Sequence, residues 1–173
     1  ENLIPATTYY VRGYAINSNG TGYGEQVAFT TQCDEAGISS FPYTEEFANE
    51  QLPMCWQNID NMGNDQDWEF TNPGDVNFLS TPYTNGFAIL DSDNYGSGKS
   101  QDADLVSPVF DFTKMENIVL SFEHYFRSYS GSSATISYSV DNGVTWSQLA
   151  QYSGSDEGSG TTPAIYGQDI TSL

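Results

Sequence analysis

Residues 87–108 read FAILDSDNYGSGKSQDADLVSP and place two apolar runs on either side of an acidic loop. The apolar side chains predict one strand at residues 87–90 and a second at residues 105–106, before a proline. Gly96 and Gly98 allow the loop to turn sharply, because glycine has no Cβ to clash at positive φ. We therefore expect the chain to be organised as strands and loops around this segment.

The same loop carries more negative charge than its neighbours in sequence can balance. Asp91, Asp93, Asp102 and Asp104 lie on one connection, and the whole chain has only 4 Lys and Arg residues. Carboxylates this close in sequence repel one another unless a cation lies between them. Because hard divalent cations prefer oxygen ligands, Ca²⁺ is the expected ion. The alternative is a solvated acidic loop, since the spacing is not that of an EF-hand loop.

The overall composition excludes several classes of partner. The chain has 173 residues, enough for one ordinary domain and part of another, and a formal net charge of −19. This charge argues against nucleic acid and anionic lipid as partners, because both require basic surfaces. No apolar run approaches the ~20 residues of a membrane span. Aromatic residues make up 14% of the chain, and tyrosine-rich, lysine-poor surfaces suit sugar or protein recognition.

The two cysteines predict a disulfide bond. Cys33 and Cys55 cannot complete a zinc site by themselves, and the one histidine, His124, lies far away in the sequence. A bond between them would contribute about 3 kcal/mol in the chain-entropy description. It implies an oxidising compartment, and therefore an extracellular or periplasmic protein.

Residues 1–31 predict a β-hairpin. Residues 9–16 alternate in the period of a strand, and residues 26–31 form the return strand. Asn19-Gly20 is a strong signal for the turn, because a two-residue type I′ turn needs positive φ twice.

This hairpin resembles the last strands of a fibronectin type III domain. The residues that carry the resemblance are Leu3, Pro5, Thr7, Tyr9, Val11, Ala15, Asn17, Gly20, Tyr23, Gly24, Phe29, Thr30 and Thr31. The resemblance covers about a third of such a domain and implies that the Tyr9 hydroxyl bonds to the backbone a few residues upstream. Two strands alone are marginally stable in water, so we expect this part to lean on the next domain or on the missing part of its own domain, or to be partly disordered. Residues 32–40 then form a polar linker.

Several further strands are predicted in the second half of the chain. Residues 118–126 alternate, and His124 shares a face with two phenylalanines, which favours a packed, hydrogen-bonded histidine over a catalytic base. Residues 134–140 and 164–170 also read as strands. The best candidate for a helix is a short one at residues 111–116, in a connection.

Residues 139–146 read SVDNGVTW and resemble the Asp-box of sialidase blades. In that motif the side chain of the Asp, here Asp141, ties down its own turn. The glycine, Gly143, takes the strained position, and Trp146 packs beneath. A propeller requires the motif repeatedly, and this chain has it once. We therefore interpret it as a structural hairpin and not as evidence of glycosidase activity.

A second acidic loop and a short strand lie earlier in the chain. Residues 60–68 offer oxygen ligands at Asp60, Asn64, Asp65 and Asp67, for a metal ion or for an ordinary Asx-rich turn. Residues 43–47 predict a short strand that directs Glu45 inward or onto a site. Trp56 is expected in the core.

Residues 41–173 resemble the jelly-roll modules called cleaved-adhesin or MAM-like domains, found in bacterial surface adhesins and secreted proteases. The resemblance is carried by Phe41, Pro42, Tyr43, Thr44, Glu45, Leu52, Pro53, Cys55, Trp56, Trp68, Asp91, Ser92, Asp93, Leu105, Val106, Ser107, Pro108, Leu120, Ser121, Phe122 and the segment 139–146. It implies a non-catalytic β-sandwich with structural calcium, which we assign to Glu45, Asp91, Asp93 and Asp102. It also implies two more strands than this chain contains.

The expected fold is all-β: a β-sandwich of jelly-roll type after part of a fibronectin type III β-sandwich. The leading function is a non-catalytic extracellular binding module that adheres to a glycan or protein ligand and contacts other domains of its polypeptide. One alternative is an accessory module of a secreted protease or glycosidase. Another is a glycoside hydrolase with paired carboxylates, whose separation a sequence does not show. Candidate aromatic platforms are Tyr83, Tyr95, Tyr129 and Tyr152.

Overall fold

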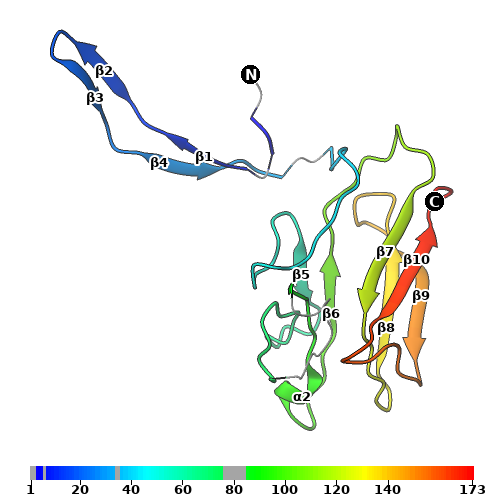
Figure 1. The fold of residues 1–173 in the computed structure, drawn as a ribbon. Helices are drawn as coiled ribbons and strands as arrows, with labels where there is room; N and C mark the ends of the chain where they lie inside the picture. Colours follow the sequence, from blue (N-terminus) through cyan, green and yellow to red (C-terminus); the bar gives the residue numbers. More distant parts are fainter. Residues whose placement is uncertain (1–2, 6, 34–35, 76–84) are drawn as a thin grey trace.

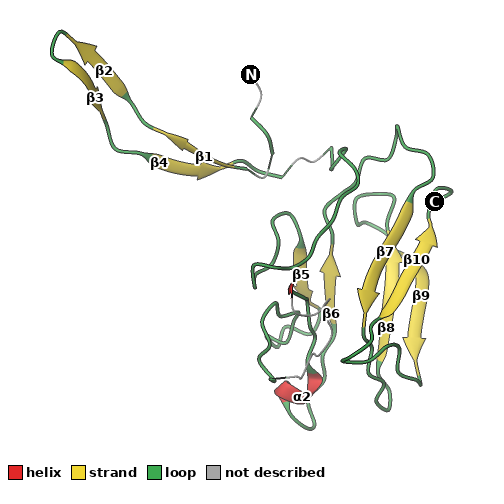
Figure 2. Cartoon of the chain, in the orientation of Figure 1, coloured by secondary structure: helices red, strands yellow, loops and turns green. Residues whose placement is uncertain are grey.

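A computed structural model of the chain describes residues 3–5, 7–33, 36–75 and 85–173. In this part the secondary structure is almost entirely β, and its strands pair as small antiparallel sheets (Figures 1 and 2). The prediction of an all-β, sandwich-type fold is confirmed. No helix among the described residues is long and apolar enough to cross a membrane.

The first four strands form one long hairpin, which we call the arm. β1 (Thr8–Val11) pairs with β4 (Val27–Thr30), and β2 (Tyr14–Asn17) pairs with β3 (Gly20–Tyr23). The turn residues are Ser18 and Asn19, between the paired Asn17 and Gly20, so the hairpin turns one residue earlier than predicted. Gly20 has positive φ and Asn19 does not, so the predicted type I′ turn on Asn19-Gly20 is wrong. Figure 1 shows the arm projecting away from the rest of the chain.

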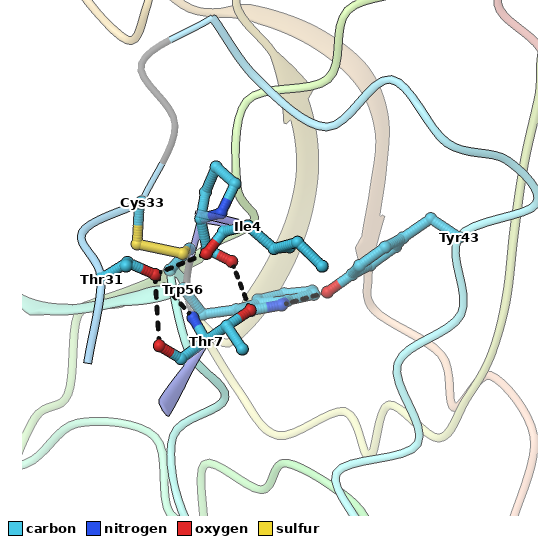
Figure 3. Close-up of a disulfide and its surroundings, with 8 residues drawn as sticks. Ile4, Thr7, Thr31, Cys33, Tyr43 and Trp56 are labelled. Carbon is cyan, nitrogen blue, oxygen red and sulfur yellow. Dashed lines mark hydrogen bonds between the residues drawn. A yellow bond between two sulfur atoms is a disulfide. The ribbon is translucent and has the colours of Figure 1, made fainter. Parts of the chain in front are cut away.

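Side chains near the base of the arm hold its first residues in place (Figure 3). The Tyr9 hydroxyl accepts a hydrogen bond from the Ile4 N–H at 2.8 Å, as the sequence predicts. The Thr31 hydroxyl donates to the Ile4 carbonyl at 2.7 Å and accepts from the Thr7 N–H at 2.9 Å. The chain before β1 is therefore tied to the end of β4.

Two connections join the arm to the remaining residues, 41–75 and 85–173, which we call the body. The predicted disulfide between Cys33 and Cys55 is formed, with Cα atoms 5.8 Å apart and a sequence separation of 22 (Figure 3). Ile38, in the predicted linker, pairs with the backbone beside Phe110 in a parallel bridge. The linker is therefore attached to the body at both its ends.

Four strands of the body form two layers (Figure 1). β7 (Val119–His124) pairs with β10 (Ala164–Asp169), and β8 (Ser133–Tyr138) pairs with β9 (Ser147–Ser153). Aromatic side chains fill the space between the layers, because alternation along each strand sends every second side chain inward. Tyr166 of β10 is 8% exposed.

A third pair of strands and a group of aromatic rings complete the body. β5 (Gln57–Asp60) pairs with β6 (Ala103–Val106), which includes the strand predicted at residues 105–106. Trp56 is half-buried, lies 5.2 Å from the Phe47 ring and donates to the Tyr43 hydroxyl at 2.9 Å. It therefore packs among aromatic rings, but it is only half-buried and is not one of the buried core residues.

Three further local predictions are wrong. Residues 87–90 form only a single bridge, between Ile89 and Glu69, in place of a strand. Residues 43–47 are irregular and end at Phe47 with φ 53°, a left-handed conformation that does not continue a strand. Residues 111–116 form a turn and not a helix.

The one described helix is α2 (Ser92–Tyr95), inside the segment predicted as a loop. Asp91 precedes it and supplies the N-cap. Asp is among the best N-capping residues because its carboxylate accepts the free N–H groups of the first turn. The acidic character that suggested a metal loop therefore also explains this helical turn.

Candidate functional site

Asp91 is the predicted metal ligand with the most distinctive environment. It is 8% exposed, and its Oδ1 accepts the N–H groups of Asp93 at 3.0 Å and Asn94 at 3.2 Å. Its Oδ2 is buried and has no hydrogen-bond partner among the described residues. A Cβ placed on Gly74 would overlap this oxygen, so the backbone approaches it closely. A buried carboxylate oxygen without a partner fits the role of a cation ligand.

The other three predicted ligands have partners of their own. The Glu45 carboxylate accepts the Phe47 N–H at 2.8 Å, and the Asp102 carboxylate accepts from the Asn61 amide at 3.2 Å. Asp93 forms an ion pair with Arg127 at 3.2 Å.

The structure therefore does not gather the four predicted ligands into one cluster. Within the described ranges, no group of three or more His, Cys, Asp and Glu side chains is arranged to hold a metal ion. The fit to calcium rests on Asp91, and the calcium site as a whole stays a prediction.

The second acidic loop forms an Asx-rich turn around Asp60. Its carboxylate accepts the backbone N–H groups of Met62, Gly63, Asn64 and Asp65, at 2.6–2.9 Å. Desolvation favours the neutral form, but these four N–H groups outweigh it and lower the pKa of Asp60 below its usual value. Asp60 therefore closes an Asx-rich turn, and a metal ion in this loop stays a prediction.

The segment at 139–146 is the predicted structural hairpin, and it connects β8 to β9. The Asp141 carboxylate accepts both the N–H and the hydroxyl of Thr145, at 2.8 and 2.6 Å, and the hydroxyl of Ser139 at 2.7 Å. These bonds lower the pKa of Asp141 to about 2. Gly143 has φ 82°, and the Trp146 indole donates to its carbonyl at 3.1 Å. Each residue of the motif thus has a structural role.

His124 is packed, as predicted, between aromatic rings. Its ring centroid lies 4.8 Å from that of Tyr152 and 5.8 Å from that of Phe122. Burial lowers the pKa of His124, while the charge of Glu157 opposes the shift. Burial thus favours the neutral form of His124, which packs against Tyr152 between the layers.

The candidate aromatic platforms have different environments. Tyr152 stacks on His124 between the layers, and the Tyr95 hydroxyl donates to the Asp67 carbonyl at 3.1 Å. Tyr83 lies outside the described residues. Tyr129 is 47% exposed. Of the three candidates that the structure describes, Tyr129 is the one beside an open hollow.

This hollow, which we call the groove, lies at one end of the β8–β9 hairpin and has a volume of about 540 Å³. It is lined by Ser128, Tyr129, Ser130, Gly131, Ser132, Ser133, Gln151, Ser153 and Gly154. None of these residues is charged, although the chain has a net charge of −19. A pattern that could have indicated the groove is the polar alternation on β8 and β9, where the outward side chains include Ser133, Gln151 and Ser153.

Tyr129 is held by a short turn and by a neighbouring cation. Ser132 accepts the Tyr129 N–H at 2.7 Å and donates to its carbonyl at 2.8 Å, which closes the turn. The Arg127 guanidinium lies 4.9 Å from the Tyr129 ring centroid and also pairs with Asp93. Arg127 therefore links the edge of the groove to α2.

The groove combines an exposed aromatic ring with several hydroxyl and amide groups, and such a surface can bind a ligand without performing chemistry on it. Comparison of the chain with protein-family models, curated proteins and solved structures found no match.

Proposed function

We propose that this chain is a non-catalytic binding module of an extracellular bacterial protein, and that it adheres to a glycan or protein ligand. The observation that carries the proposal is the groove. It is open, it lies on paired strands, and its lining combines the exposed ring of Tyr129 with polar side chains. The disulfide supports an extracellular location, because such bonds persist in oxidising compartments.

The same observations support the adhesin-module resemblance only at the level of an all-β fold. Calcium remains part of the proposal as a structural ion, with Asp91 as its anchor, because one buried oxygen of this residue has no hydrogen-bond partner within the described ranges. The other proposed ligands, Glu45, Asp93 and Asp102, would have to exchange their present partners for the ion.

Binding of the whole chain to immobilised ligands tests the proposal. A panel of oligosaccharides and extracellular matrix proteins is presented to the chain, with a heat-unfolded sample as the control. We expect saturable binding to at least one class of ligand by the folded chain alone. Failure to bind any member of either class would contradict a role in adhesion.

The arm favours a second candidate, an accessory module that docks on other domains of its own polypeptide. Its exposed apolar side chains include Tyr10 at 66% and Ile16 at 70% exposure. Large exposed apolar surfaces mark interaction sites. The surrounding reading frame distinguishes the candidates: a protease or glycosidase domain on the same polypeptide would support the accessory role.

A further inference from the structure

We propose that the groove binds an uncharged saccharide, with a sugar ring stacked on Tyr129. This inference rests on the proposed binding function and names the class of ligand. It differs from the proposal above because a protein ligand bound elsewhere, for example by the arm, would satisfy the binding function and leave the groove without a role.

The groove has one exposed aromatic residue, Tyr129, that can stack on a sugar. Tyr129 is 47% exposed, yet it is not loose, because its turn is closed by Ser132 and its ring lies beside Arg127. A fixed, exposed aromatic face offers apolar area at a low cost in conformational entropy. Sugar rings present apolar C–H faces of similar size, so a stacked sugar can bury the ring without leaving its own hydroxyls unpaired.

The lining of the groove also offers free hydrogen-bonding groups. Ser130, Ser133, Gln151 and Ser153 are exposed, and their side chains form no hydrogen bonds within the described part of the chain. Ser133 and Ser153 are direct cross-strand partners, so their side chains leave the same face of the hairpin. Hydroxyls and an amide can both donate and accept, as the vicinal hydroxyls of a saccharide require.

The charge around the groove favours an uncharged ligand. The lining has no ionisable group except the tyrosine, and the cation at its edge, Arg127, is already paired with Asp93. The surrounding chain has 23 acidic residues against 4 basic ones, and its field repels polyanions. We therefore expect uronate-rich and sulfated polysaccharides to bind more weakly than an uncharged sugar.

The experiment measures binding of the whole chain to immobilised neutral oligosaccharides built from glucose, galactose, mannose or N-acetylhexosamine, with uronate and sulfated polymers alongside. Tyr129→Ala removes the stacking ring, and Gln151→Ala removes one amide. Two controls are Tyr10→Ala, a tyrosine on the arm that is 66% exposed against 47% for Tyr129, and Ser137→Ala, an exposed residue of β8 whose cross-strand partner, Gln148, does not line the groove.

We expect binding of a neutral oligosaccharide that salt barely changes. Tyr129→Ala should weaken it about tenfold, which corresponds to about 1.4 kcal/mol. Gln151→Ala should weaken it about two- to tenfold, the range for one lost hydrogen bond. Both controls should bind as the unmodified chain does, and all four variants should unfold at nearly the same temperature because the replaced side chains are exposed.

Three results would overturn the inference. Binding of a neutral oligosaccharide that is unaffected by Tyr129→Ala places the sugar outside the groove. A preference for sulfated or uronate polymers contradicts the charge argument. If the chain binds proteins but no neutral sugar at millimolar concentration, the proposed binding function stands and the saccharide inference is wrong.

Discussion

The arm and the β8–β9 hairpin are both antiparallel hairpins, and they differ in what covers them. In β8–β9 the side chains alternate between exposed and half-buried, and the inner row faces β7 and β10. In the arm almost every side chain is exposed, and apolar residues lie on both faces, as with the neighbouring Tyr10 and Val11. Both hairpins are paired along most of their length, the arm in two segments and β8–β9 with a register shift after Ile136. The comparison therefore separates strand pairing, which both hairpins have, from burial, which only one has.

The two hairpins also differ in their turns and their charge. The β8–β9 turn is closed by the carboxylate of Asp141, whereas in the arm turn the Asn17 amide oxygen accepts the Asn19 N–H at 2.8 Å. Between residues 3 and 32 the charged residues are Arg12 and Glu25 alone, so the arm is neutral while the body carries nearly all the negative charge. A neutral apolar arm on an acidic body is suited to contact with another domain.

The largest expected effect is the loss of stability when a buried ring of the body is removed, compared with an exposed ring of the arm. Tyr166→Ala should destabilise the body by about 3–5 kcal/mol, because it removes a buried ring that stacks on Phe122 at 5.2 Å. Tyr10→Ala, on the arm, should change the free energy of unfolding by no more than about 0.5 kcal/mol. Urea unfolding measures both. Equal losses in the two variants would mean that the arm has a buried face after all.

The second effect concerns the covalent link between the two regions. Cys33→Ser should lower stability by about 3 kcal/mol, as expected for opening a loop of 22 residues. Hydrogen exchange should become faster in the arm than in β7 and β10, since the arm has little burial to hold it. Cys55→Ser should give the same loss, and the double variant should add nothing. Unchanged exchange in the arm would show that the disulfide does not hold it.

The third effect tests calcium in the body. At 100 times its dissociation constant, Ca²⁺ should stabilise the chain by about 2.7 kcal/mol relative to EDTA, seen as a rise in melting temperature. Asp91→Asn keeps an oxygen for the cap of α2 and should abolish the rise. Asp104→Asn, on β6 and outside the proposed ligand set, should preserve it. If the unmodified chain shows no calcium-dependent rise, the alternative of a solvated acidic loop without a metal is supported.

The smallest effect is local and depends on pH. The pKa of Asp141 is lowered from 3.8 to about 2 in the folded chain, so its stabilising bonds are complete above pH 4 and are lost as the pH falls toward 2. Amide exchange at Thr145 should therefore accelerate below about pH 3, while that at Asn19 in the arm turn follows only the chemical exchange rate. Asp141→Asn should remove the pH dependence. An identical response in both turns would argue against the carboxylate as its cause.

Several features of the molecule follow from short stretches of sequence. The presence of a hairpin in the arm, the Asp141 hairpin, the bond from Ile4 to Tyr9 and the disulfide were all predictable. Each depends on residues close in sequence, on a known motif or, for the disulfide, on the pairing of two cysteines. Alternation likewise predicted the strands around His124 and its packed environment.

Other features escaped prediction because they depend on distant partners. Among the four carboxylates assigned to one metal site, Asp93 pairs with the distant Arg127 and Asp102 accepts from the distant amide of Asn61. Glu45 and Asp91 instead accept N–H groups two or three residues away. The sequence could show that they are acidic but not which donor each would meet.

The sequence by itself determined the all-β class, the acidic charge, the Asp141 hairpin and the pairing of the two cysteines. Strand period and turn chemistry are local properties, and composition is additive, so none of them depends on tertiary contacts. Tertiary structure alone decided which hairpin is covered, which Asp91 oxygen lacks a partner in the described part of the chain and where an uncharged groove opens. These depend on which segments lie against one another, and burial is a property of that contact.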